Sequence, residues 1–212
     1  MIYITIVGIL GTIHGDDSFR AEKGYTLEMM KEAISEFNPD IICGEVRPED
    51  WDKYCNDKSY SGYLGPGEYR RLIIPYCENN GIEFVPVDWY EEDMVDWDYM
   101  RNYSESKKEK FTKDLEVVYE KIWDIGKKSL LPMNSFELDE IVMKKQDLFN
   151  SLDPVMHNMY WVARNQLMIE RIKKAIENNP SKKILCTVGA EHNYFYYNEL
   201  KKLNCKLIYP LR

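Results

Sequence analysis

The amino-acid sequence predicts an α/β fold, with a mostly parallel central sheet flanked by helices. Two observations predict it: short apolar runs rich in β-branched residues, and helical patterns that lie between them. Such alternation is typical of βαβ units, in which helices cover both faces of a parallel sheet. The runs that we expect to be strands are residues 2–10, 40–46, 82–89, 183–188 and 205–210.

Helices are expected after several of these strands. In the segment 27–37, apolar residues recur at i, i+3, i+7 and i+10, which places them on one helix face that ends before Asn38-Pro39. The segment EYRRLIIPYCENNG is also helical in pattern and ends at Asn80-Gly81, but Pro75 must kink or split it. A further helix is expected over residues 194–203.

A long stretch between the third strand and the C-terminal strands lacks any strand pattern. Residues 90–179 are rich in Glu, Lys, Leu and Met, and the final helix of the stretch has a capped start at Asp153-Pro154. There is no repeat, low-complexity tract or flexible linker. We therefore expect a single α/β domain, 1–212, with a helical insertion, 90–179, that covers the binding site like a lid.

Composition excludes several classes of protein. The 28 basic residues face 36 acidic ones, and a net charge of -8 disfavours binding to nucleic acid. The five cysteines are an odd number without C-x-x-C spacing, which predicts a reducing compartment, the cytoplasm. The first apolar run is only nine residues long and lacks a positive leader, so we expect neither a signal peptide nor a membrane partner.

Ionisable side chains stand at the ends of four predicted strands. His14 follows the first strand, Glu45 closes the second, Asp88 closes the third, and His192 follows the strand at 183–188. A glycine stands three residues before each histidine, which suits a tight strand exit. Because ligands bind at the carboxyl ends of parallel strands, these four side chains are expected to converge on one pocket.

Two imidazoles and a carboxylate are the ligand set of a catalytic divalent metal such as Mn, Co, Zn or Fe. His14, Glu45 and His192 are therefore the predicted metal ligands, and Glu45 is an alternative base for the bound water. Without a metal, a histidine would act as general base and a glutamate would orient it. Each residue also has a structural interpretation, because strand-end histidines often serve in turns and Asp88 can cap the next helix.

An arginine on the helix after Pro154 needs an anionic partner. His157, Trp161, Arg164 and Met168 share one helix face by their spacing. A guanidinium on this stripe is costly unless Glu45, Asp88 or a substrate oxyanion meets it. Arg164 is thus a candidate catalytic residue, with a structural salt bridge to the sheet as the alternative. His157 is interpreted as a structural residue.

Five motifs in this order resemble the TraB/Tiki proteins, within the broader erythromycin-esterase and ChaN-like superfamily. The motifs cover both ends of the chain and leave about a third, the helical insertion, without support. They are LGTIH (10–14), NPDIICGEVR (38–47), EYRRLIIPYCENNGIEFVPVD (68–88), RNQLMIERI (164–172) and VGAEH (188–192).

The resemblance implies an α/β core and a site built from both G-x-x-H histidines, the glutamate of the second strand and an arginine, with Asn165 beside it. Tiki-type members are metal-dependent peptidases, erythromycin esterases hydrolyse an ester with His and Glu, and ChaN-like members bind haem through a tyrosine. This chain departs from the pattern because it has no membrane segment and carries Glu191 where many relatives have a neutral residue.

The sequence thus predicts a metal-assisted hydrolase of an amide or ester bond in a small-molecule or peptide substrate. Its catalytic residues would be Glu45, Arg164 and Asp88, and its metal ligands His14, Glu45 and His192. A metal-free His/Glu esterase and a non-catalytic, haem-like small-ligand binding protein are the alternatives, and a degenerate interaction module is a third. The sequence does not indicate the substrate or the oligomeric state.

Overall fold

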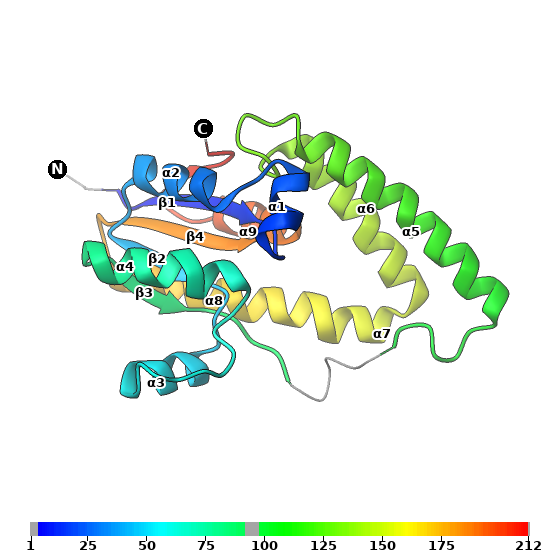
Figure 1. The fold of residues 1–212 in the computed structure, drawn as a ribbon, viewed down its shortest axis with the longest axis horizontal. Coiled ribbons are helices and arrows are strands. Elements are labelled where there is room, and N and C mark those ends of the chain that lie inside the picture. Colours follow the sequence, from blue (N-terminus) through cyan, green and yellow to red (C-terminus); the bar gives the residue numbers. More distant parts are fainter. Residues whose placement is uncertain (1–3, 92–97, 212) are drawn as a thin grey trace.

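A computed structural model describes residues 4–91 and 98–211. Within them, five parallel strands form one sheet in the order β3-β2-β4-β1-β5 (Figure 1). The predicted fold class, a parallel α/β sheet flanked by helices, is confirmed. The strands are β1 (Ile6–Thr12), β2 (Ile41–Gly44), β3 (Glu83–Pro86), β4 (Lys183–Gly189) and β5 (Lys206–Ile208).

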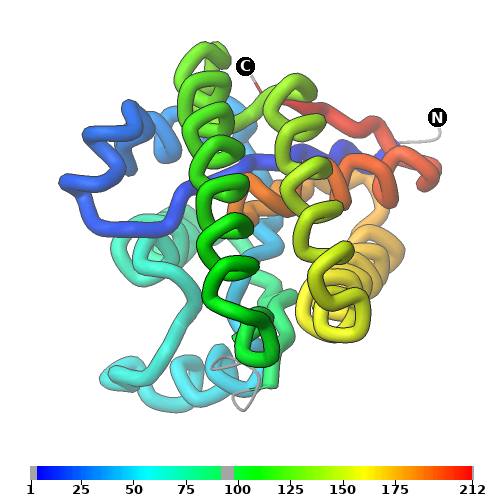
Figure 2. The backbone as a smooth tube through the Cα atoms, turned by 90° about the vertical axis from the view of Figure 1, so that its right-hand side faces the viewer, coloured from blue at the N-terminus to red at the C-terminus, as the bar shows by residue number. Residues whose placement is uncertain are grey.

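Helices cover both faces of this sheet (Figures 1 and 2). Helices α2 and α4 bury apolar side chains against one face, and α8 and α9 do so against the other. The α-helices are α1 (Asp17–Lys23), α2 (Leu27–Phe37), α3 (Pro48–Asn56), α4 (Ile74–Asn80), α5 (Glu105–Gly126), α6 (Phe136–Leu152), α7 (Pro154–His157), α8 (Ala163–Asn178) and α9 (Asn193–Leu200). Shorter turns are η1 (Tyr69–Ile73), η3 (Asn158–Val162) and η4 (Ala190–His192).

Local sequence signals explain the helix boundaries. The side chain of Thr26 caps the N-terminus of α2, and Asn38 ends this helix in the left-handed conformation at φ 51°. The expected helix is not split at Pro75, because the π-helical turn η1 runs directly into α4 and Ile73 and Ile74 both keep right-handed helical backbone angles. Pro75 stands in the first turn of α4, directly after η1, so the hydrogen-bond pattern of the helix changes at the residue that lacks an N–H.

All five strands differ from the predicted runs by a few residues at one or both ends, the first and third among them. The strand expected at 2–10 is Ile6–Thr12, and residues 1–3 lie outside the described part of the chain. The strand expected at 82–89 ends at Pro86, but the backbone after it still forms hydrogen bonds to residues at and after the end of β2. The Asp88 N–H donates to the carbonyl of Val46 at 3.0 Å, which fixes Asp88 beside the end of β2.

The described part of the predicted insertion divides into two regions with different packing. Helices α5 and α6 form a hairpin at the carboxyl edge of the sheet (Figures 1 and 2). Helix α8 instead lies on the sheet and buries Met168, Ile169 and Ile172 completely. The last helix of the expected lid is therefore the core crossover between β3 and β4, because its apolar stripe matches a sheet face.

No helix in the described residues has the length and apolarity needed to cross a bilayer. All five cysteines are free thiols, and Cys43, Cys77 and Cys186 are buried. The buried thiols act as small apolar residues in the core.

Neighbouring residues of α8 test the packing of that helix on the sheet. Met168→Ala should lower the free energy of unfolding by about 2–4 kcal/mol, because it leaves a cavity where the side chain is fully buried. Leu167→Ala is the matched control, since this side chain is 39% exposed and should cost less than about 1 kcal/mol. Urea titration measures both values, and equal costs would contradict the core role of α8.

Candidate functional site

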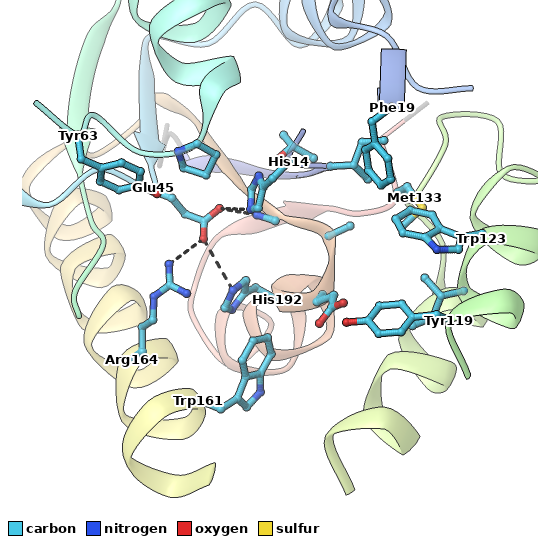
Figure 3. Close-up of a pocket in the computed structure, with 17 residues that line it drawn as sticks. His14, Phe19, Glu45, Tyr63, Tyr119, Trp123, Met133, Trp161, Arg164 and His192 are labelled. Atoms are coloured by element: carbon cyan, nitrogen blue, oxygen red, sulfur yellow. Dashed lines mark hydrogen bonds and ion pairs between the residues drawn. The ribbon is translucent and has the colours of Figure 1, made fainter. Parts of the chain in front are cut away.

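The carboxyl edge of the sheet brings together three side chains that are far apart in sequence. His14 follows β1, Glu45 follows β2, and His192 ends η4 directly after β4. The two carboxylate oxygens of Glu45 face the two imidazoles separately. Oε2 lies 3.6 Å from His14 Nε2, and Oε1 lies 3.7 Å from His192 Nε2 (Figure 3).

Sheet topology accounts for this convergence. Strand β4 lies between β1 and β2, and its last residue, Gly189, pairs with Thr12 of β1. The Gly189 N–H donates to Glu45 Oε2 at 2.6 Å. A Cβ at Gly189 would lie 2.7 Å from His14 Nε2, which is too close for the histidine to keep its place. The glycine of the second G-x-x-H motif is therefore needed for close approach.

A buried ion pair supports His14 from behind. Nδ1 of His14 lies 2.7 Å from Glu68 Oε1, and the other oxygen of Glu68 accepts from Arg20 Nη2 at 2.8 Å. Thr12 also donates its hydroxyl to Glu68 at 2.9 Å. The sequence pattern does not single out Glu68 or Arg20, although Glu68 begins the motif at 68–88. Glu68 stands at the start of η1 and Arg20 in the last turn of α1, where acidic and basic residues are respectively ordinary on an exposed helix.

This arrangement sets the charge of His14. Loss of solvent lowers the pKa of His14, but the hydrogen bond to Glu68 and the negative charges of Glu68 and Glu45 outweigh it and raise the pKa above its ordinary value. Burial alone would raise the pKa of Glu68, yet His14 and Thr12 hold it below the usual range. His14 therefore favours the imidazolium form, with 43% of its side chain exposed.

His192 has the opposite environment. Its Nδ1 lies 2.7 Å from Asn165 Oδ1, while Nδ2 of Asn165 donates to the Trp161 carbonyl at 2.8 Å. The amide oxygen is thus the acceptor, so His192 donates from Nδ1 and keeps a lone pair on Nε2. Trp161 stacks on the imidazole at 4.2 Å between ring centroids. Burial, together with the charges of Arg164 and His14, lowers the pKa of His192 well below its ordinary value.

Arg164 meets two of the anions that the sequence proposed for it. Its Nε and Nη2 contact the two oxygens of Asp88 at 2.8 and 3.1 Å, and Nη2 also lies 3.2 Å from Glu45 Oε1. Burial lowers the pKa of Arg164, but the charges of Asp88 and Glu45 raise it overall. The salt bridge from helix to sheet is therefore present, and it stands in the wall of the pocket. Asp88 holds Arg164 and also accepts the Trp89 N–H at 2.8 Å.

Glu45 is the centre of the cluster and is 1% exposed. Burial raises its pKa, the positive charges of His14 and Arg164 lower it, and the charge of Asp88 raises it again. The net pKa lies above the ordinary value. A carboxyl group whose pKa is shifted by burial and by nearby charges is typical of functional sites.

His14, Glu45, Arg164 and His192 line an open cavity of about 440 Å³. Helix α5 of the hairpin supplies Tyr119, Ile122 and Trp123 to its wall, and Phe19 faces them from α1 (Figure 3). Helix α5, from the first part of the expected insertion, thus borders the pocket. His157 is not among the lining residues and is buried beside a different, smaller cavity.

His14, Glu45 and His192 are residue types that bind metals, but their contacts in this structure are not those of a metal site. Both histidines commit Nδ1 to an oxygen acceptor, as metal-ligating histidines do. Glu45, however, already bonds Gly189 N–H and Arg164. In the part of the chain that the structure describes, no group of three or more His, Cys, Asp or Glu residues is arranged to hold a metal ion. The metal site stays a prediction, as does the haem alternative.

Comparisons with protein-family models, curated proteins and solved structures found no match for this chain. The resemblance to the TraB/Tiki proteins stays a prediction carried by the five sequence motifs. The function must therefore be inferred from the side chains of the pocket.

Replacing Glu68 tests whether it sets the charge of His14. Glu68→Gln should lower the pKa of His14, because the variant removes a negative charge and weakens the hydrogen bond to Nδ1. Glu22→Gln removes an exposed charge outside the pocket and is the control. Histidine NMR titration measures the pKa, and an unchanged value in Glu68→Gln would show that Glu68 only fills space.

Proposed function

We propose that the protein hydrolyses an ester or amide bond with a water molecule activated between His192 and Glu45. The observation that carries this proposal is a pair of histidines on one buried carboxylate, with pKa values shifted in opposite directions. Where the pKa values of two titratable groups are shifted in opposite directions, the group with the raised pKa is suited to give a proton and the group with the lowered pKa to take one.

His192 is the proposed general base. It is neutral over the physiological range, its Nε2 lone pair lies on the pocket side, and Asn165 fixes its orientation. A water placed between His192 Nε2 and the Glu45 carboxylate would lose its proton to the imidazole and attack a substrate carbonyl carbon. Glu45 would hold this water and stabilise the imidazolium that forms.

His14 is the proposed general acid. Its Nδ1 faces Glu68 and its raised pKa favours the form that also carries a proton on Nε2, and the exposed side chain lines the cavity. Arg164 lies on the same wall and adds a fixed positive charge, which stabilises the oxyanion of the tetrahedral intermediate. When that intermediate collapses, His14 would protonate the leaving oxygen or nitrogen. The carboxylic acid and the alcohol or amine are then released.

A metal-assisted form of the same hydrolysis is the second candidate, favoured by the Nδ1 hydrogen bonds of both histidines. His14, Glu45 and His192 would hold the ion. A bound Mn, Co, Zn or Fe ion would lower the pKa of its water and polarise the carbonyl. Arg164, paired with Asp88, would keep its role at the oxyanion in either form.

We place this activity in the cytoplasm and assign it a small-molecule or peptide substrate. Free cysteines support a reducing compartment, and the cavity volume lies in the range typical of small-ligand sites. The net charge of -8 supports a role that does not involve nucleic acid.

Histidine variants test the proposed roles. His192→Ala and His14→Ala should each lower kcat by about a hundredfold to ten-thousandfold, the usual contribution of a general acid or base. His157→Ala is the matched control, because the third histidine lies outside the pocket. The assay is a screen of 4-nitrophenyl esters and peptide amides. Full activity in His192→Ala would contradict the proposal.

Metal analysis separates the two forms of the mechanism. Each purified variant is loaded with Mn, Co, Zn or Fe, and bound metal is measured by mass spectrometry. The metal-assisted form expects His14→Ala and His192→Ala to lose metal and activity together. The metal-free form expects wild-type activity to survive chelation.

The pH dependence of kcat/KM gives an independent test. The base must be neutral, so activity should fall as the pH drops through the pKa of His192, well below 6.5. The acid must be protonated, so activity should also fall as the pH rises through the pKa of His14, above 6.5. The expected profile is a bell whose upper limb moves to lower pH in Glu68→Gln. A profile without an upper limb would exclude His14 as the acid.

A further inference from the structure

A second cavity adjoins the catalytic pocket. Its volume is about 240 Å³, and it shares two lining residues, Trp161 and Glu191, with the larger cavity. Trp161 is the ring that stacks on His192. The second cavity therefore begins directly beside the proposed base.

Aromatic side chains dominate the wall of this second cavity. They come from the segment before α5, from α6 and from η3, and they are Tyr99, Phe149, Tyr160 and Trp161. Tyr99 contacts both Phe149 and Tyr160 edge to face, with ring centroids 5.4 and 6.4 Å apart. Such a wall favours an apolar occupant.

The charged residues of this wall neutralise one another. Nζ of Lys145 bonds both carboxylate oxygens of Glu191 and the Tyr119 hydroxyl, the last at 2.8 Å. The Lys145 side chain is only 5% exposed. The ion pair therefore leaves no free charge in this wall to attract a polar ligand. The ion pair with Lys145 explains why the VGAEH motif carries an acidic residue at Glu191.

We infer that the second cavity is an acyl subsite, which takes an apolar acyl chain of the hydrolysed substrate. The inference rests on the proposed function and names its substrate class. His14 faces the leaving group as the acid, so the acyl part lies away from His14, on the side of His192 and Trp161. At roughly 30 Å³ for a group the size of one water, the cavity of about 240 Å³ has room for a chain of about eight carbons beyond the carbonyl.

A series of 4-nitrophenyl esters tests the subsite. The leaving group stays constant while the acyl chain grows from acetate through butanoate and hexanoate to decanoate. For wild type, kcat/KM should rise by up to about fourfold per methylene through hexanoate and level off before decanoate, as each buried methylene adds apolar contact. A ratio of hexanoate to acetate near one would overturn the inference.

Two matched phenylalanine variants test whether the preference for longer acyl chains arises in the second cavity. Phe149 lines the second cavity and also contacts Phe111 across the α5–α6 hairpin, whereas Phe111 is not a lining residue. Phe149→Gln should reduce the ratio of hexanoate to acetate by about tenfold or more, while Phe111→Gln should keep it. Both variants lose the same hairpin contact, so an equal loss of preference in both would contradict the subsite.

Binding separates failure of the subsite from failure of the proposed function. The probes are the ethyl and hexyl ethers of 4-nitrophenol, which cannot be hydrolysed, measured by calorimetry on wild type and both variants. The hexyl ether should bind wild type about tenfold or more tightly than the ethyl ether, and this preference should vanish only in Phe149→Gln. If the ethers bind in this pattern but no ester is hydrolysed, the proposed function is overturned and the subsite is not. Equal affinities for the two ethers overturn the subsite.

Discussion

The buried carboxylate of Glu45 is the constraint on which the rest of the site depends. An isolated carboxylate with 1% exposure would cost several kcal/mol, so its neighbours must compensate its charge. The compensation comes from three elements: the Gly189 N–H after β4, Arg164 on α8 and His14 after β1. The same contacts fix the ends of three strands and one helix around a single point.

A second buried pair makes the two histidines unequal. Glu68 and Arg20 lie behind His14 and favour its charged form, whereas Asn165 and the Trp161 ring enclose His192 and favour its neutral form. Neither difference depends on the histidines themselves, since both follow a strand in the same G-x-x-H context. A nearly symmetrical motif thus becomes an asymmetrical pair through the residues packed around it.

The α5–α6 hairpin forms part of the wall around the candidate site. Helix α5 supplies an aromatic wall to the catalytic cavity, and α6 contributes Lys145, which is anchored to Glu191 next to His192. One ion pair therefore links the hairpin to the η4 turn. Groups proposed to recognise a substrate come from this region, while groups proposed to act on the bond lie at the carboxyl edge of the sheet.

The sequence by itself determined the parallel sheet and the placement of His14, Glu45, Asp88 and His192 at strand ends. These features follow from local periodicity and from the rule that parallel strands end at one edge. Only the tertiary structure decided that Glu68 and Arg20 support His14, that α8 belongs to the core and that a second cavity adjoins Trp161. Those outcomes depend on which distant surfaces pack together, and a charged residue near either end of a helix carries the same local signal whether it is buried or solvated.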